Sequence, residues 1–327
     1  MGKSWKDLDR EQLLADIAEM YYEEGHTQQE IAQAVGLTRS AVSRLLNEAQ
    51  EKGVLEIRIH RPLRFDHTLG DALAARFRLQ QAYVVAWRPG PEGKLKAQLG
   101  LAAARALTEM LPPGGSLGIS WGTTLKAVVD GLADAPLQAG RVVQLIGAMG
   151  ARDVAYDAHA LVSKVVSFCG CEGIYLHAPF LVESAEVAAS LRSHPSLRTS
   201  LEAARSCDVA LVGAGTANPE SSSLYLGGHI PLRELNALRA AGAVGDSGGY
   251  HYDRSGTAVA ADFHNRLVGI SREDLLHIPQ RLVVAGGLAK VEALLGALRG
   301  GYATVLVTDS GAAAELLRIS AAERHMH

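Results

Sequence analysis

From Tyr83 onward, short runs of β-branched and aliphatic residues alternate with longer helical stretches, and this alternation constrains the fold most strongly. The runs that read as strands are YVVAW, SLGISW, VVQLIG, GIYLHA, DVALVGAG, AVGD, RLVVAGG and ATVLVTD. Helical stretches separate most of them, for example 94–110, 125–132 and 159–168. Such alternation predicts a Rossmann-like α/β domain, with a mostly parallel sheet and helices on both faces. An apolar content of 48% with only 5% aromatic residues suits buried parallel strands.

The first sixty residues have a different pattern, which predicts a separate helical domain. Apolar residues from Leu13 to Tyr21 recur at steps of three and four, and Gly25 ends that helix. A second helix is expected over 27–34 and a third over 38–52, each followed by a glycine. Residues 54–59 read as a strand, and Pro62 follows. The chain therefore divides into a helical domain at 1–60 and an α/β domain at 61–327.

The second and third helices carry the spacing of a helix-turn-helix. A small residue, Ala32, is followed four positions later by the turn glycine Gly36, and then by aliphatic residues at Val42 and Leu45. Two helices that cross at a fixed angle need these residue types at these positions. The pattern predicts that the third helix enters the major groove of DNA.

Polar and basic side chains follow the outward side of this motif. Arginines can donate to guanine edges or phosphates, and hydroxyls and amides can bind phosphate oxygens or base edges. The residues expected to contact double-stranded DNA are Thr27, Gln28, Gln29, Thr38, Arg39, Ser40, Ser43, Arg44 and Asn47. The formal net charge of the chain is −3, so a DNA surface has to be local. Between Thr38 and Arg64, six basic residues stand against three acidic ones.

Three glycine-rich junctions between a strand and a helix are candidate ligand sites. The segment GISWGTTL at 118–125 opens a helix, whose amides can bind an anion with help from the hydroxyls of Ser120, Thr123 and Thr124. Asp246 ends the run AVGD, and a carboxylate there can accept bonds from sugar hydroxyls. Lys290 follows AGGLA in the first turn of a helix, where a cation is favourable beside a bound anion. The alternatives are a simple turn for the first junction, a helix cap or turn residue for Asp246, and an exposed lysine for Lys290.

A fourth glycine cluster does not predict a dinucleotide site. The segment GAG at 213–215 starts like a dinucleotide-binding loop, but the third glycine is missing and Asn218 and Pro219 replace the helix. We therefore interpret it as a loop near the ligand and expect no cofactor. The three cysteines include no CxxC pair, and we expect free thiols in a reducing compartment and no metal site. The chain shows no membrane-spanning run and no signal peptide, which indicates a cytoplasmic protein.

Several blocks in a fixed order resemble the SorC family of sugar-responsive bacterial transcriptional regulators, the DeoR-type sugar-binding regulators. They are TQQEIAQAVGLTRSAVSRLLNEAQEKGVLEIRI, GISWGTTL, QLIGAMG, VGAGT, GAVGD and VVAGGLAKVEALLGALRGG. The resemblance covers about 13–317. It implies an effector domain like those of sugar-phosphate isomerases and CoA transferases, a sugar, polyol or sugar-phosphate effector, and a homo-oligomer, namely a tetramer.

The resemblance also assigns effector-binding residues by position. They are Ser120, Gly122, Thr123, Thr124, Gln144, Gly215, Asp246 and Lys290. Asp246 would bind sugar hydroxyls, while Thr123, Thr124 and Lys290 would bind phosphate. The segment QLIGAMG departs from the family's usual QLNGG-like form, so the bulkier Ile146 and Met149 would change the size of the accepted ligand.

Two other functions are compatible with these residues. An isomerase-like enzyme with an appended helix-turn-helix could use Asp246, Asp262 or Glu183 as a base, and Lys290 could form a Schiff base. A helix-turn-helix used only for dimerisation is the other alternative. Nothing in the spacing of these residues demands catalysis, so we expect a regulator and no enzyme.

Overall fold

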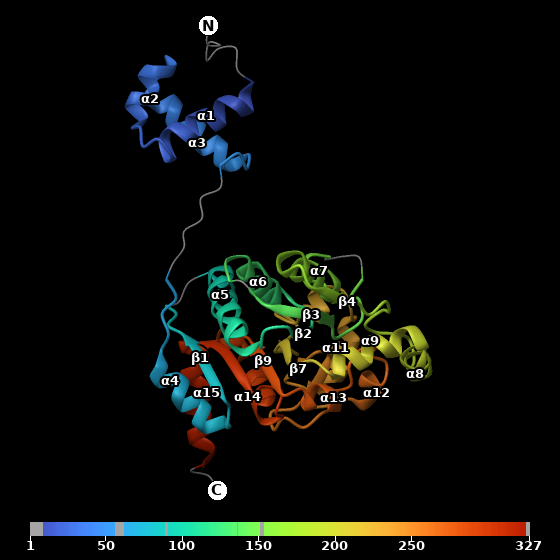
Figure 1. Cartoon of the computed structure of the whole chain (residues 1–327). Coiled ribbons are helices and arrows are strands. Elements are labelled where there is room, and N and C mark those ends of the chain that lie inside the picture. Colours follow the sequence, from blue (N-terminus) through green and yellow to red (C-terminus); the bar gives the residue numbers. More distant parts are fainter. Residues whose placement is uncertain (1–8, 56–61, 89–90, 136, 151–153, 325–327) are drawn as a thin grey trace. The chain divides into compact units, whose positions relative to one another are not determined.

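The computed structural model describes residues 9–55, 62–88, 91–135, 137–150 and 154–324. The chain forms two compact units, Met1–Pro62 and Leu63–His327 (Figure 1). We call the first unit the head and the second the sheet domain. The boundary expected at residues 60 and 61 falls in the segment 56–61, outside the described residues.

The head consists of the three expected helices. They are α1 (Arg10–Tyr22), α2 (Gln28–Val35) and α3 (Arg39–Glu51). The turn between α2 and α3 contains Gly36 in the left-handed conformation, φ 70°, which a residue without a Cβ adopts at little cost. The strand expected at 54–59 is described only at Val54 and Leu55, which are half-buried against the head's core.

The core of the head comes from one face of each helix. Its fully or almost fully buried members are Leu14, Ile17, Ala18, Ile31, Ala32, Val42, Leu45, Leu46 and Ala49. Three of the four residues that define the motif spacing, Ala32, Val42 and Leu45, lie in this core. Burial of these side chains therefore fixes how α2 and α3 cross.

The sheet domain is built on a seven-stranded parallel sheet with the order β1-β10-β9-β5-β2-β3-β4. Its strands are β1 (Gln81–Val85), β2 (Gly115–Ile119), β3 (Ala139–Gln144), β4 (Glu172–Ile174), β5 (Val209–Gly213), β9 (Gln280–Val284) and β10 (Val305–Asp309). Seven of the eight expected strand runs form this sheet.

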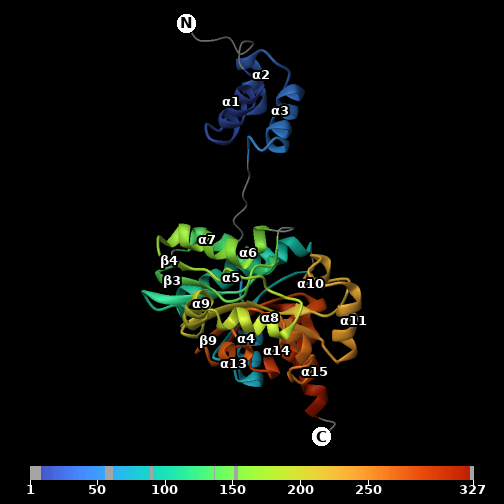
Figure 2. The same cartoon turned by 90° about the vertical axis from the view of Figure 1, so that its right-hand side faces the viewer.

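Helices cover both faces of the sheet (Figures 1 and 2). One face carries α5 (Glu92–Met110), α6 (Thr123–Gly131) and α7 (Ala158–Cys169). The other carries α4 (His67–Phe77), α9 (Pro195–Arg205), α14 (Val291–Arg299) and α15 (Ser310–Arg324). Neighbouring strand residues alternate between the two cores: Leu211 packs with the first group and Val212 with the second. Both faces are apolar, as a buried parallel sheet requires.

The remaining helices are short and lie in the connections between strands. They are α8 (Ala185–Ser193), α10 (Ser223–Leu226), α11 (Leu232–Ala240), α12 (Ala261–His264) and α13 (Arg272–His277), with 3-10 turns at η2 (Leu132–Asp134), η3 (Val154–Tyr156) and η4 (Leu288–Lys290). None of the helices in the described part of the chain is both long and apolar enough to span a membrane.

The run AVGD differs from the expectation. It forms β7 (Gly245–Ser247) of a separate antiparallel sheet, between β6 (Gly215–Thr216) and β8 (Tyr250–Tyr252). Asp246 therefore lies in the middle of a short antiparallel strand, and it does not end a strand of the parallel sheet. A run of four residues cannot distinguish the two cases, because both place apolar residues before the acid.

Candidate DNA-binding surface and effector cavity

The exposed face of α3 is set by the face that the helix buries. Val42, Leu45, Leu46 and Ala49 point into the head's core. At 100° per residue, Ser40, Arg44 and Asn47 lie on the opposite side, and all three are exposed. Arg44 Nε donates to the backbone oxygen of Ser40 at 3.4 Å, which leaves the ends of the guanidinium toward solvent.

The other three expected residues of this element are Thr38 and Arg39, at the start of α3, and Ser43, one turn later. Thr38 caps the helix, and its hydroxyl accepts from the amide of Ala41 at 3.2 Å. The hydroxyls of Thr38 and Ser40 are 3.1 Å apart. Arg39 is exposed, whereas Ser43 is half-buried, so Ser43 is less accessible than its neighbours Ser40 and Arg44.

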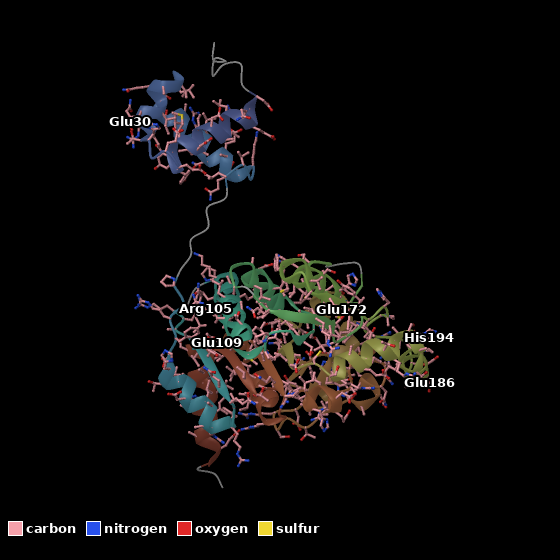
Figure 3. The ribbon with its side chains drawn as sticks, in the orientation of Figure 1. Glu30, Arg105, Glu109, Glu172, Glu186 and His194 are labelled. Carbon is pink, nitrogen blue, oxygen red and sulfur yellow. The ribbon has the colours of Figure 1, made fainter. Side chains whose placement is uncertain are left out.

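The start of α2 forms a capping box, in which Thr27 and Glu30 satisfy each other's amides. Thr27 N donates to Glu30 Oε2 at 2.8 Å, and Glu30 N donates to Thr27 Oγ1 at 3.3 Å. These bonds hold the pKa of the Glu30 carboxyl below its usual value. Figure 3 shows Glu30 at the edge of the head. The Thr27 side chain is thus occupied by its own helix, whereas Gln29 is exposed and Gln28 partly so.

An open groove of about 700 Å³ brings the start of α2 and the start of α3 together. Its lining comes from all three helices of the head: Tyr21, Gly25, His26, Thr27, Gln28, Gln29 and Arg39. Four of the nine expected DNA-contacting residues therefore share one concave surface. The remaining five lie on α3 or at its cap.

A charged contact fixes α3 against α1. Arg10 Nε donates to Glu48 Oε1 at 3.1 Å, and Lys52 Nζ lies 3.0 Å from the same oxygen. The bonds from Arg10 and Lys52 lower the pKa of the Glu48 carboxyl to about 2. Glu48 thus joins α3 to α1 through Arg10. The same carboxylate offsets the positive charge of Lys52.

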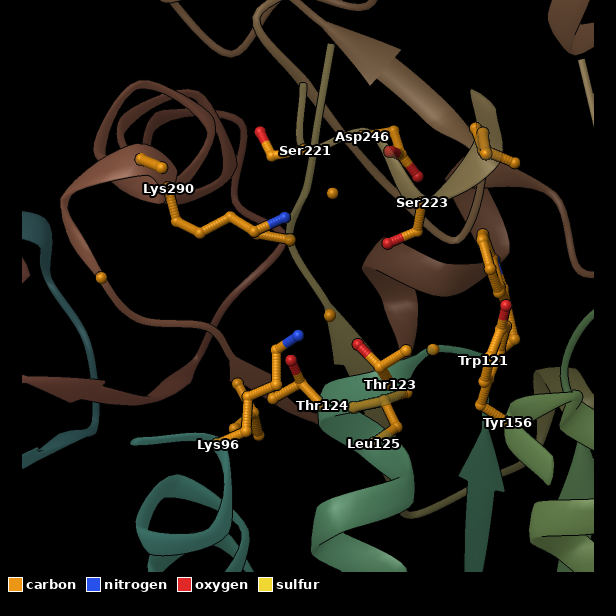
Figure 4. A pocket seen from close by; sticks show the side chains of 18 of the residues that line it. Lys96, Trp121, Thr123, Thr124, Leu125, Tyr156, Ser221, Ser223, Asp246 and Lys290 are labelled. Atoms are coloured by element: carbon orange, nitrogen blue, oxygen red, sulfur yellow. The ribbon is translucent and has the colours of Figure 1, made fainter. Parts of the chain in front are cut away.

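The sheet domain contains a cavity of about 520 Å³ beside the carboxyl ends of β2, β5 and β9. Open α/β sheets bind ligands at this edge. Seven of the eight expected effector-binding residues line the cavity: Ser120, Gly122, Thr123, Thr124, Gly215, Asp246 and Lys290. Figure 4 shows the side chains of Thr123, Thr124, Asp246 and Lys290 around it.

Gln144 is the residue that the structure does not bring to the cavity. It is only 1% exposed at the end of β3. Its amide nitrogen donates to the backbone oxygen of Ile146 at 2.7 Å, and its amide oxygen accepts from Leu176 N at 3.3 Å. Both ends of the side chain thus bind backbone groups of the adjoining loops. Gln144 shapes the loops behind the site and does not line the cavity.

The start of α6 forms the floor of the cavity. Gly122 is the residue before the helix and has φ 134°, a conformation that favours glycine. No side chain caps α6, in contrast to the capped helices α2 and α3. The first turn therefore presents its amides and the hydroxyls of Thr123 and Thr124 to the cavity, an arrangement suited to an anion.

Two lysines from different elements reach the same cavity. Lys290 ends η4 and is the residue just before α14, whereas the sequence predicts it inside the first turn of a helix. Lys96, on α5, was not anticipated. In Figure 4 the ammonium groups of both lysines extend into the cavity on the side that holds Thr124. One side of the cavity thus combines two cations with an uncapped helix start.

Asp246 provides a carboxylate elsewhere in the same cavity. It is 7% exposed, and its Oδ2 accepts from Gly249 N at 3.2 Å. Gly215 lies directly opposite it in β6. A Cβ on Gly215 would lie 2.0 Å from Asp246 Oδ1, so only glycine allows the carboxylate this position. The remaining acceptor capacity of Asp246 suits the hydroxyl groups of a ligand.

An aromatic wall and two hydroxyls complete the lining. The rings of Trp121 and Tyr156 are tilted by 35° with centroids 6.3 Å apart, and both line the cavity. Ser221 and Ser223 also line it, and Ser221 Oγ is buried without a hydrogen-bond partner among the described residues. Sequence reasoning missed these four residues. Only Trp121 carried a signal, because it lies inside the quoted block GISWGTTL.

The described residues contain no group of three or more histidine, cysteine, aspartate or glutamate side chains that could hold a metal ion. The three cysteines are free. Burial raises the pKa of the Cys207 thiol to about 12, so this sulfur is held as a neutral thiol in the core.

Comparison with known proteins identifies both units of the chain. Residues 61–318 match the family model of the sugar-binding domain, Sugar-bind, and residues 14–52 match sigma-70 region 4, a helix-turn-helix. The chain is 30% identical to the deoxyribonucleoside regulator of Bacillus subtilis over 95% of its own length and 99% of that protein. It is 33% identical to the transcriptional regulator LsrR of Escherichia coli K12, with 96% and 97% coverage.

Solved structures of transcriptional regulators also match this chain. The full-length sorbitol operon regulator SorC from Klebsiella pneumoniae is 26% identical, with a TM-score of 0.71 and coverage of 95% of this chain and 100% of that one. A DeoR family regulator from Listeria monocytogenes is 27% identical with a TM-score of 0.70. These relatives are regulators, which supports a sugar-responsive DNA-binding regulator over an isomerase-like enzyme. With its helix-turn-helix and its sugar-binding domain, the chain belongs to the SorC family of DeoR-type sugar-binding transcriptional regulators.

Proposed function

We propose that the effector of this regulator is a phosphorylated sugar or polyol bound in the cavity of the sheet domain. The phosphate lies between the start of α6 and the ammonium groups of Lys96 and Lys290. The hydroxyl groups of the ligand bond to Asp246. The observation that carries the proposal is that one cavity holds two lysines beside an uncapped helix and, separately, a buried carboxylate.

The charges favour a phosphate over a neutral ligand. An uncapped helix start attracts negative charge, and charge-assisted hydrogen bonds are about twice as strong as neutral ones. A neutral sugar would bond well to Asp246 but would carry no negative charge for the two lysines and the start of α6 to attract. The wall of Trp121 and Tyr156 suits the C–H face of a sugar ring.

A binding assay with paired ligands tests this proposal. Pentose and hexose phosphates, their unphosphorylated parents and inorganic phosphate are titrated into the full chain by calorimetry. We expect at least one sugar phosphate to bind more tightly than its parent. Lys290→Met should then weaken its binding by about ten- to a hundredfold, the loss of a hydrogen bond to a charged group. Lys94→Met, on the exposed side of α5, is the matched control.

Two outcomes would contradict the proposal. One is a neutral sugar or polyol that binds as tightly as its phosphate. The other is binding of a sugar phosphate that Lys290→Met and Lys94→Met leave equally unchanged. Asp246→Asn should weaken binding of the sugar phosphate while leaving binding of inorganic phosphate unaltered, because the two groups contact different parts of the ligand.

The proposed DNA contacts are the outer residues of α3, Ser40, Arg44 and Asn47, together with Arg39 and the start of α2. Recognition helices commonly act in pairs on two half-sites, so the regulator is proposed to act as a homo-oligomer, a tetramer by its resemblance to the family. Sedimentation of the full chain tests this part, and a monomer at micromolar concentration would contradict it.

A further inference from the structure

We propose that Asp309 and Ser310 connect the effector cavity to the segment through which the chain enters the sheet domain from the head. This relay rests on the proposed function, because it describes how occupancy of the cavity reaches the DNA-binding unit. It consists of two adjacent side chains at the junction of β10 and α15, and each holds a different part of the domain.

Asp309 holds the wall of the cavity. It is 2% exposed, and its Oδ2 accepts from Gly287 N at 2.5 Å. A Cβ on Gly286 would lie 2.6 Å from that oxygen, so the turn formed by the two glycines sits directly on the carboxylate. Both glycines line the cavity, together with Leu288, which is 69% exposed.

The same carboxylate also fixes the first turn of α15. Asp309 Oδ1 accepts from Gly311 N at 3.0 Å and from Ala312 N at 3.2 Å. One planar group therefore binds the cavity wall with one oxygen and the helix start with the other. If the carboxylate turns about its side-chain bonds, both sets of bonds have to change together.

Ser310 connects this helix start to β1. Its hydroxyl accepts from Trp87 N at 3.1 Å and donates to Trp87 O at 3.1 Å. Trp87 lies two residues after the end of β1. The backbone of this segment is thus fixed at its amide and at its carbonyl by a single hydroxyl group.

The residues beside Trp87 hold the segment Arg64–Asp66, which we call the lead-in segment. Ala86 N donates to Arg64 O, and Asp66 N donates to Val84 O, both at 2.8 Å. Phe65 forms an antiparallel bridge with Val85. The lead-in segment is therefore paired with the strand end that Ser310 holds.

The relay joins the glycine turn, the start of α15 and the lead-in segment, which are far apart in sequence. Its hydrogen bonds can change partners. A ligand anion that draws on the amide of Gly287 or Leu288 competes with Asp309 for the glycine turn. The carboxylate then shifts its bonds toward the start of α15, and Ser310 moves with it. A ligand that binds one of these two hydrogen-bonding arrangements more tightly than the other raises the population of that arrangement. The size of the shift, which extends to the lead-in segment, is set by the difference between the two affinities.

A double-mutant cycle without any ligand tests the relay. Gly286→Ala places a methyl group against Asp309 and disturbs the cavity end. Ser310→Ala removes the hydroxyl in the middle of the path. Hydrogen exchange is measured at the amides of Asp66 and Ala86 in the full chain. We expect Gly286→Ala to speed their exchange by about three- to tenfold, the worth of one hydrogen bond, and to have no further effect in the Ser310→Ala background.

The controls separate the relay from general loss of stability. Ser200→Ala also removes a hydroxyl that bonds to a backbone oxygen, that of Tyr175 at 2.9 Å, away from the path. It should leave the amides of Asp66 and Ala86 unchanged. Ser310→Thr keeps the hydroxyl and should restore the coupling. If Gly286→Ala does not fold, Asp309→Asn replaces it, because an amide cannot accept with both of its terminal atoms.

The relay is overturned if Gly286→Ala leaves exchange at Asp66 and Ala86 unchanged, or if its effect is the same with and without the Ser310 hydroxyl. A second arm adds ribose 5-phosphate and other sugar phosphates to the wild type and to Ser310→Ala. The relay is supported if the sugar phosphate slows hydrogen exchange at residues 286–290 in both proteins but changes exchange at the lead-in segment only in the wild type. Absence of protection by every sugar phosphate tested counts against the proposed function, while the ligand-free cycle still decides the relay.

Discussion

Asp246 and Gly215 face each other across the antiparallel pair of β6 and β7, and a Cβ on Gly215 would lie 2.0 Å from Asp246 Oδ1. The position of the buried carboxylate therefore depends on a hydrogen atom at residue 215. Gly213, two residues earlier, also lines the cavity, but a Cβ there would meet only Val284 O, at 4.0 Å. The two glycines form a natural pair of test and control positions.

Gly215→Ala should weaken effector binding strongly, because the added methyl group displaces the Asp246 carboxylate. A loss of about tenfold or more is expected, the typical worth of a hydrogen bond to a charged group. Calorimetric titration with the sugar phosphate that binds the wild type measures it. Gly213→Ala should bind within about twofold of the wild type, as expected for a substitution that creates no close contact. Equal affinities for the two variants would argue against a role for Asp246 in the site.

Arg44→Ala should lower DNA affinity by removing a cation from the centre of the exposed face of α3. The expected loss of binding free energy is about 1–3 kcal/mol if Arg44 contacts a base. If it contacts phosphate, the slope of log affinity against log salt concentration should become shallower by about 1. Fluorescence anisotropy with a selected duplex at several salt concentrations measures both. Gln12→Ala, on the exposed side of α1, is the control. Unchanged affinity together with unchanged oligomerisation would show that α3 is not the reading helix.

Acidification should destabilise the sheet domain through His264. Its Nε2 accepts from His251 N at 2.8 Å, which requires the neutral ring. Burial first, and then the neighbouring His251 and Arg272, lower the pKa of His264 from 6.5 to about 4. Because the folded pKa lies below the unfolded value, the stabilisation is complete above pH 6.5 and is lost as the pH falls toward 4.

The melting temperature of the sheet domain between pH 7 and pH 4 tests this linkage. His264→Asn keeps an acceptor without a titrating ring and should flatten the curve in that window. His194→Asn, at an exposed helix cap, should retain the slope of the wild type. If the two variants have the same pH dependence, another group is responsible for the acid sensitivity.

Much of the architecture could be predicted from sequence because it depends on local patterns. The strands of the parallel sheet are short apolar runs, and the structure confirms the three helices of the head. Thr27 and Thr38 cap α2 and α3, and Gly36 ends α2, whereas α1 ends at Tyr22, before Gly25. The small antiparallel sheet could not be predicted. Its strands are two or three residues long, too short for a periodic pattern, and they form only because the loops around Gly215 and Asp246 meet in space.

The residues of the cavity could be predicted from sequence where glycines indicate a particular backbone conformation. They could not be predicted where only tertiary packing brings a side chain to the cavity. The glycine junctions indicated Gly122, Thr123 and Lys290. Lys96 looks like any lysine on a helix, and only the packing of α5 beside the glycine turn brings it to the cavity. Gln144 does not line the cavity, for the converse reason. A polar residue at a strand end can face a ligand, but here the adjoining loops use both ends of its amide.

Sugar-responsive DNA binding is measured most directly as the affinity of the full chain for an in vitro selected DNA duplex, with and without sugar phosphates that bind the cavity. A sugar-responsive regulator should change its DNA affinity by about 5- to 150-fold on effector binding, the usual range of coupling between two sites. Lys290→Met should respond only at higher effector concentration and keep the wild-type affinity without effector. A ligand that fills the cavity and leaves the DNA affinity unchanged would show that the cavity does not control DNA binding.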